Sequence, residues 1–231
     1  MKRYVTLEEI SDGRKYSKND MVKADCHGCK GCSDCCHGMG SSIVLDPYDV
    51  YRLTKDLSVS FEELLPRAFE LNVVDGCILP NIKMQGLDER CSFLDENERC
   101  SIHESRPGIC RLFPLGRYYE DGKMYYILQT NECRANHSKI KVEKWVDTPR
   151  LSEYEKYICD WHYMLNALEE DVLKVLSEGQ QERANQWNML LLQIFFFAPY
   201  DTEQSFYEQF WQRKEIFLRE KVNVLNTGEK I

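Results

Sequence analysis

The chain has 231 residues, of which 43% are hydrophobic and 29% charged, and it carries a formal net charge of -8. This composition is typical of a globular protein that can bury a core. The acidic balance argues against a general binder of nucleic acids or anionic membranes, because such proteins need a basic surface to displace counterions.

Two segments bear on the location of the protein in the cell, namely the N-terminus and the longest apolar run. Residues 1–9 lack the apolar centre of a signal peptide. The run at 189–198 is shorter than the roughly 20 residues that a membrane-spanning helix needs. We therefore predict no transmembrane segment and a cytoplasmic location, where thiols stay reduced. Eleven cysteines, an odd number, then favour metal binding over disulfides.

The first strong signal along the chain is a glycine-rich segment, 26–42, that we expect to be a loop. Five cysteines fall within its first eleven residues, namely Cys26, Cys29, Cys32, Cys35 and Cys36. Two residues between cysteines allow two sulfurs to converge on one ion at about 2.3 Å. The side chains of the adjacent Cys35 and Cys36 diverge, so we expect them to serve different metals or opposite sides of one cluster.

Local signals predict two helices and a pair of strands after this loop. Asp46 as N-cap and Pro47 as the first helical residue predict one helix start. Ser60, followed by acidic residues, predicts a second. Short apolar stretches between Val73 and Met84, around an Asp-Gly turn, suggest strands.

A second cysteine segment occupies 91–117, with the spacing Cys91-x8-Cys100-x9-Cys110. Pro107 is expected to begin a helical turn that carries the last of these cysteines. Aromatic and β-branched runs flank an Asp-Gly pair in 117–128, which predicts a β-hairpin.

The character of the chain changes after residue 148. Apolar residues recur every three or four positions from Tyr154 to Leu176, which predicts an amphipathic helix ended by Gly179. A second helix should end at Phe197 and a third should begin near Asp201 or Thr202. We expect their aromatic residues to form a core. No sequence repeat is visible.

These elements predict an α+β fold in two parts. Residues 1–147 should form an irregular cysteine-rich metal-binding domain with a small β-hairpin or sheet and flanking helices. Residues 148–231 should form a helical C-terminal region. Ten of the eleven cysteines lie in the first part.

The cysteine motifs resemble a known family. The segment from Cys29 to Cys36 is similar to the CxxCxxCC signature of the YkgJ-type cysteine-cluster proteins, which are associated with chelation of zinc or iron. The segment from Cys91 to Pro114 is similar to that family's C-x-F-L and C-x-I-x-x-x-R-P-x-x-C-R-x-F-P patterns. The resemblance covers roughly residues 26–145 and places Cys133 as the eighth family cysteine. That family also resembles the cysteine-rich part of flagellin lysine methylases.

The spacing and the resemblance together nominate eight metal ligands, namely Cys29, Cys32, Cys35, Cys36, Cys91, Cys100, Cys110 and Cys133. Cys26 is a candidate additional ligand. Arg106 and Arg111 are predicted to lie behind the ligands, where they would offset negative charge and donate hydrogen bonds to sulfur. The alternative is that these arginines pair with acids such as Asp95 or Glu104.

The identity of the metal stays open at this point. Eight thiolates would complete two four-cysteine zinc sites. The cysteines from Cys26 to Cys35 instead resemble the C-x2-C-x2-C run that holds iron–sulfur clusters, although the third gap is shorter than in ferredoxins. The sequence slightly favours an iron–sulfur cluster over zinc.

Three functions fit this pattern. The first is a metal-binding protein whose centre is structural or carries electrons. The second is a protein-modifying enzyme or accessory like the flagellin lysine methylases. The third is a zinc-stabilised interaction module without catalysis, whose helical C-terminal region docks a protein partner. The chain contains no phosphate-binding loop or metalloprotease motif, and it neither assigns nor excludes catalysis.

Replacing a predicted ligand should remove metal and destabilise the first part of the chain, because metal binding and folding are coupled. We expect this of both Cys32→Ala and Cys110→Ala, measured by elemental analysis and by denaturant unfolding. Unchanged metal content in both variants would contradict the ligand set.

Overall fold

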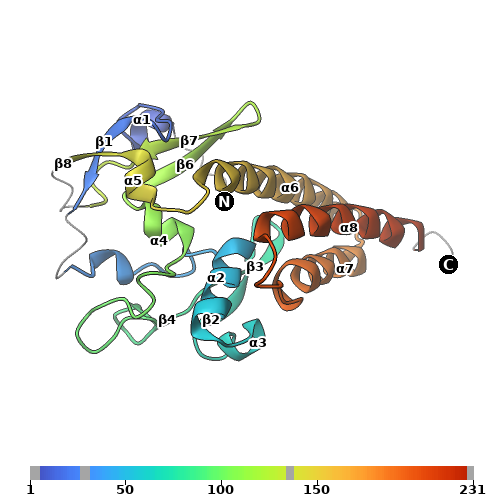
Figure 1. The fold of residues 1–231 in the computed structure, drawn as a ribbon. Helices are drawn as coiled ribbons and strands as arrows, with labels where there is room; N and C mark the ends of the chain where they lie inside the picture. Colours follow the sequence, from blue (N-terminus) through green and yellow to red (C-terminus); the bar gives the residue numbers. More distant parts are fainter. Residues whose placement is uncertain (1–5, 27–31, 134–137, 228–231) are drawn as a thin grey trace. The chain divides into compact units, whose positions relative to one another are not determined.

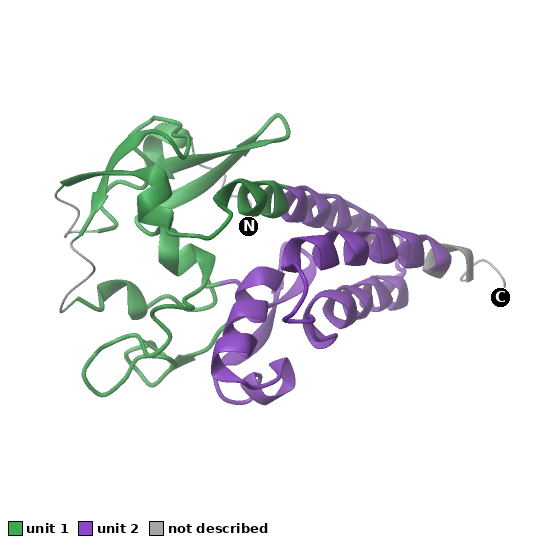
Figure 2. Cartoon of the chain, viewed as in Figure 1, with its two compact units in different colours: residues 1–43, 82–159 green, residues 44–81, 160–231 purple. Residues whose placement is uncertain are grey.

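The structure is a computed structural model that describes residues 6–26, 32–133 and 138–227 (Figure 1). It combines helices with small antiparallel sheets, so the predicted α+β class is confirmed. The chain forms two compact units (Figure 2). The first unit comprises residues 1–43 and 82–159, and the second comprises residues 44–81 and 160–231.

These units have boundaries other than those of the predicted domains 1–147 and 148–231. Segment 44–81 belongs to the same unit as the C-terminal helices, and helix α6 (Leu151–Ser177) contributes residues to both units. Compactness does not show which parts fold alone, so the domain division at residue 147 stays a prediction.

Three antiparallel strand pairs belong to the first unit. Their strands are β1 (Met21–Asp25), β4 (Met84–Gln85), β5 (Arg90–Cys91), β6 (Leu115–Glu120), β7 (Lys123–Leu128) and β8 (Ser138–Lys141). Strand β1 pairs with β8, β4 with β5, and β6 with β7. Asp121 and Gly122 join β6 to β7 and both have positive φ angles, of 50° and 74°. A two-residue type I′ turn requires this geometry, so the predicted hairpin is confirmed.

Short helices complete the first unit together with the beginning of α6. They are α1 (Leu7–Ile10), the 3₁₀ helix η2 (Asp34–Cys36), α4 (Gly108–Leu112) and α5 (Val142–Val146). The side chains of Val22, Tyr126, Val142 and Tyr157 are almost fully buried. The core of this unit therefore draws on strands β1 and β7 and on helices α5 and α6.

The second unit is mainly helical. It contains α2 (Pro47–Leu57), α3 (Phe61–Leu64), β2 (Phe69–Val74), most of β3 (Cys77–Ile82), the rest of α6, α7 (Gln181–Leu192), the π-helix η3 (Gln193–Phe197) and α8 (Phe206–Thr227). Strands β2 and β3 pair through a turn at Asp75 and Gly76, both with positive φ. The strands expected between Val73 and Met84 are thus present, and they begin earlier than predicted.

Local capping explains where several of these helices begin and end. The Asp46 carboxylate accepts a hydrogen bond from the Asp49 N–H and completes a capping box at the start of α2. Ser60 does the same at the start of α3. Gly179, with a φ of 76°, follows the end of α6, and its N–H donates to the Leu176 carbonyl at 3.0 Å.

Aromatic side chains form the core of the second unit, as expected. The Trp161 and Phe195 rings lie 5.2 Å apart between centroids, and Phe195 also contacts Phe210 and Phe217. In the described residues, no helix combines the length and apolarity needed to cross a membrane.

The start of the last helix corrects the sequence prediction. Helix α8 begins at Phe206 instead of Asp201 or Thr202. The Asp201 carboxylate accepts hydrogen bonds from the Glu203 N–H (2.9 Å) and the Gln204 amide (2.6 Å). These contacts satisfy the side chain within a turn, so the helix begins later.

One buried amide ties the β2–β3 turn to α7. Asn188 is 5% exposed, its Oδ1 accepts from the Ile78 N–H at 2.7 Å, and its Nδ2 donates to the Gly76 carbonyl at 3.2 Å. We expect Asn188→Ala to lower the free energy of unfolding by about 1–3 kcal/mol, because it leaves backbone groups without partners. Urea unfolding of the full chain measures this. The control is Asn185→Ala on the exposed face of the same helix, and an equal effect of both substitutions would contradict the assigned role.

Candidate metal centre

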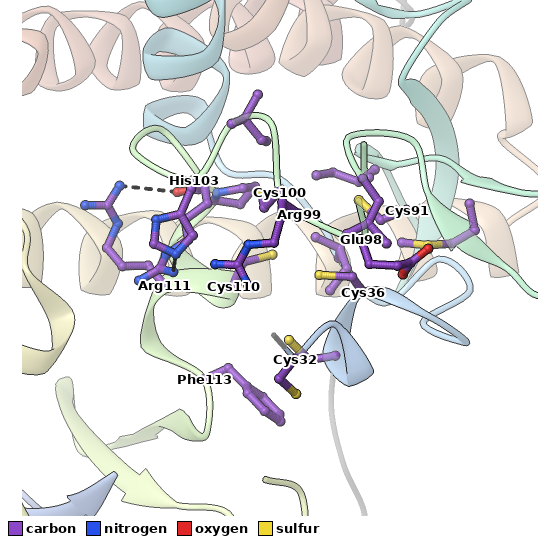
Figure 3. Close-up of a pocket in the computed structure, with 18 of the residues that line it drawn as sticks. Cys32, Cys36, Cys91, Glu98, Arg99, Cys100, His103, Cys110, Arg111 and Phe113 are labelled. Atoms are coloured by element: carbon purple, nitrogen blue, oxygen red, sulfur yellow. Dashed lines mark hydrogen bonds between the residues drawn. The ribbon is translucent and has the colours of Figure 1, made fainter. Parts of the chain in front are cut away.

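One pocket of the first unit collects six of the eight nominated cysteines. We call it the cysteine pocket, and its cysteines are Cys32, Cys35, Cys36, Cys91, Cys100 and Cys110. Figure 3 shows Cys32, Cys36, Cys91, Cys100 and Cys110 around the same space. The cavity has a volume of about 120 Å³. The two cysteine-rich segments therefore contribute to one site.

Different elements carry these cysteines. Helix η2 carries Cys35 and Cys36, strand β5 ends at Cys91, and helix α4 carries Cys110. Cys100 forms an isolated antiparallel bridge with Leu94. Pro107 is the N-cap of α4, so the predicted helical turn before Cys110 is confirmed.

The backbone brings the two segments together where the chain leaves and re-enters the first unit. Segment 44–81 belongs to the second unit, and the residues on either side of it are Ile43 and Ile82. The Ile82 N–H donates to the Ile43 carbonyl at 3.0 Å. Both side chains are buried and line the cysteine pocket. This hydrogen bond keeps the chain before residue 44 close to the chain after residue 81, and these two parts carry the two cysteine segments.

Glu98 also joins the two segments through polar contacts. Ser33 Oγ donates to Glu98 Oε2 at 3.0 Å, and His37 Nε2 lies 2.8 Å from the same oxygen. Arg90 Nε forms an ion pair with Glu98 Oε1 at 3.3 Å. The hydrogen bond with His37 lowers the pKa of Glu98, and the same bond raises the pKa of His37. We call these four residues the Glu98 clasp.

A backbone contact reinforces the clasp. The Gly38 N–H donates to the Glu89 carbonyl at 3.1 Å, and His37 forms an antiparallel bridge with Arg90. The cysteine pocket is thus held by contacts that need no bound ion.

The thiols of the pocket shift one another's pKa values through hydrogen bonding and electrostatic repulsion. A hydrogen bond from Cys36 lowers the pKa of Cys35 to about 7 and raises the pKa of Cys36. Charge on Cys91 or Cys110 raises the pKa of Cys36 further. Burial is the main cause that raises the pKa of Cys91 and of Cys100. Several thiolates in this pocket would therefore repel one another unless a cation offsets their charge.

The two nominated arginines line the same pocket but have different partners. Arg111 is buried, and its guanidinium donates to the backbone carbonyls of Asp147 (2.8 Å) and Glu104 (3.1 Å). Arg106 Nη1 lies 2.6 Å from His103 Nε2. The charge of Arg106 contributes to lowering the pKa of Cys35, after the larger effect of the Cys36 hydrogen bond. Their predicted contact with metal-bound sulfur stays a prediction.

The remaining nominated cysteines lie elsewhere. Cys29 is outside the described residues. Cys26 is buried after the end of β1, Cys133 is half-buried, and neither lines the cysteine pocket. Their ligand roles stay predictions. Cys77, expected to be a core residue, is 2% exposed in the second unit, and burial raises its pKa to about 12.

The chemistry of the pocket fits a soft metal. Six cysteine sulfurs are the donors that zinc and iron–sulfur clusters take. Within 6–26, 32–133 and 138–227, however, no group of three or more His, Cys, Asp or Glu side chains is close enough to hold a single ion. The cysteines line a cavity and do not converge on one point.

Sequence reasoning missed two residues of this site. Glu98 lies in an acidic turn beside Glu96, and no local feature distinguishes the two carboxylates. Trp145 lines the pocket and donates its indole N–H to the Leu112 carbonyl at 3.0 Å. Only the folded arrangement of distant segments identifies either residue.

The comparisons with known proteins agree with the cysteine motifs. A family model named CxxCxxCC and described as "Putative zinc- or iron-chelating domain" matches residues 28–145. The uncharacterized protein MJ0661 of Methanocaldococcus jannaschii is 27% identical over 139 residues, covering 56% of this chain and 71% of that protein. No solved structure matches the chain.

Loss of the Glu98 clasp should loosen the contact between the two cysteine segments. We expect Glu98→Ala to raise the alkylation rates of Cys36 and Cys91 several-fold in metal-free protein, because Ser33 and His37 lose their common acceptor. Mass spectrometry of the alkylated peptides measures the rates, and Glu96→Ala on the same turn is the control. Wild-type rates in Glu98→Ala would show that the clasp does not hold the segments.

Proposed function

Because the chain belongs to the CxxCxxCC family of zinc- or iron-chelating domains, we propose that it holds an iron–sulfur cluster in the cysteine pocket of the first unit. The observation that carries this proposal is one cavity, of about 120 Å³, lined by six cysteines from two distant segments. A buried water needs about 10–15 Å³ of such space. The cavity therefore has room for a metal centre, and its six cysteines exceed the four ligands that a single zinc ion takes.

The residues of the pocket have separable roles in this proposal. The thiolate ligands would come from the six cysteines that line the pocket. The buried side chains of Ile82, Leu94 and Ile102 line the cavity and limit the access of water. Arg106 supplies a positive charge beside the sulfurs. A bound iron–sulfur cluster would supply one-electron transfer, so we propose a redox role for the protein.

Zinc is the alternative metal, and a zinc-stabilised interaction module is the corresponding alternative function. Anaerobic purification followed by iron, zinc and acid-labile sulfide analysis separates the two. We expect iron and sulfide together, with absorbance at roughly 400 nm. Colourless protein with about two zinc ions per chain would support the four-cysteine zinc sites instead. Protein without either metal would contradict both.

A substitution pair tests the proposed location of the centre. Cys91→Ser should lose most of the iron or zinc, because it removes one of the six cysteines that line the cysteine pocket. Cys159→Ser should keep the metal, since Cys159 is half-buried outside the pocket with its Sγ 3.4 Å from the Gly122 carbonyl. Elemental analysis of the two variants provides the comparison. Equal metal contents would place the centre elsewhere.

A further inference from the structure

His103 and Arg106 form a pair at the wall of the cysteine pocket. Both residues line the cavity, and Arg106 Nη1 lies 2.6 Å from His103 Nε2. A guanidinium can only donate hydrogen bonds, so Nε2 of His103 must accept. The imidazole is then neutral and carries its proton on Nδ1. This nitrogen lies 3.8 Å from the exposed carboxylate of Glu104.

Electrostatics are consistent with a neutral ring. Burial, followed by the charge of Arg106, lowers the pKa of His103. The ring is therefore a stable acceptor for the guanidinium near neutral pH. An imidazolium at this position would instead repel the arginine.

The position of Arg106 differs from that of the second arginine in the site. The guanidinium of Arg111 donates its hydrogen bonds to backbone carbonyls. This side chain therefore stabilises the loop around α4. The charge of Arg106 acts on Cys35, in the first cysteine segment, and on Cys100, in the second. A cation near both segments can stabilise a negatively charged centre shared between them.

We propose that His103 is a positioning residue that holds the Arg106 guanidinium beside Cys35 and Cys100, where its charge stabilises the metal-bound thiolates. This inference rests on the proposed function of the same pocket. It gives His103 a role through Arg106 and not as a metal ligand. A long arginine side chain has many rotamers, and a fixed acceptor keeps its charge at the site.

The test combines five variants with two readouts that do not depend on catalysis. These are the reduction potential of the centre and the rate at which a chelator removes the metal. His103→Leu and Arg106→Leu should each lower the potential, because a nearby cation favours the more negative reduced state. Each should also speed metal loss several-fold. The double variant should show no larger change than either single one, since the two residues act as a unit.

Two further substitutions serve as rescue and control. His103→Gln keeps a side-chain acceptor and should behave nearly as the wild type. His162→Leu removes a histidine of the second unit, which contacts Asn166 at 3.1 Å, and should change neither readout. Wild-type behaviour of His103→Leu together with a shifted Arg106→Leu would overturn the proposal. Failure of His103→Gln to rescue would also overturn it and would indicate that the imidazole itself binds metal.

A measurement on metal-free protein separates this inference from the proposed function. Nitrogen NMR of the full chain reports the tautomer of His103. We expect the Nδ1–H tautomer in the wild type and its loss in Arg106→Leu. An Nε2–H tautomer in the wild type would overturn the pairing with Arg106. Absence of metal from the native protein would instead contradict only the function on which the inference rests.

Discussion

Segment 44–81 belongs to the second compact unit, and a backbone hydrogen bond between Ile82 and Ile43 joins the two residues that flank it. The first cysteine segment ends before segment 44–81, and the second begins after it. With the two ends joined, cysteines far apart in the sequence line one cavity. The Glu98 clasp adds a polar contact between the same segments. Because Glu98 and His37 are substantially exposed, this contact orients the segments more than it stabilises them.

Gathering six thiols into one cavity creates an electrostatic problem. Burial raises the pKa of Cys91 and Cys100, and neighbouring sulfurs raise the pKa of Cys36. The pocket therefore resists holding several thiolates without a compensating charge. Arg106 supplies one positive charge, and a metal centre would supply the rest, with release of the thiol protons on binding. The same reasoning explains why an acidic protein places arginines in its cysteine-rich segment.

The sequence predicted what local chemistry decides. The Asp-Gly pairs at the β2–β3 and β6–β7 turns, the capping residues Asp46 and Ser60, and Gly179 at the end of α6 each act within a few residues. The amphipathic pattern likewise predicted the long helix α6. Cysteine spacing and the family resemblance identified the six cysteines that line the cysteine pocket.

The features that the sequence did not predict depend on distant partners. Segment 44–81 joins the C-terminal helices, where Asn188 binds the backbone at Gly76 and Ile78. No local pattern encodes that contact. The π-helical turn at Gln193–Phe197 also went unpredicted. Arg213 donates to the carbonyl of Ile194, within this turn, and to that of Ala198, which follows it. Glu98 and Trp145 acquire their places only when the two cysteine segments meet.

X-ray absorption spectroscopy of the anaerobically purified full chain tests the central claim most directly. The account predicts that the bound metal is surrounded by sulfur at about 2.3 Å, with additional iron–iron scattering if the centre is an iron–sulfur cluster. A metal bound mainly by oxygen or nitrogen would contradict a centre built by the cysteine pocket.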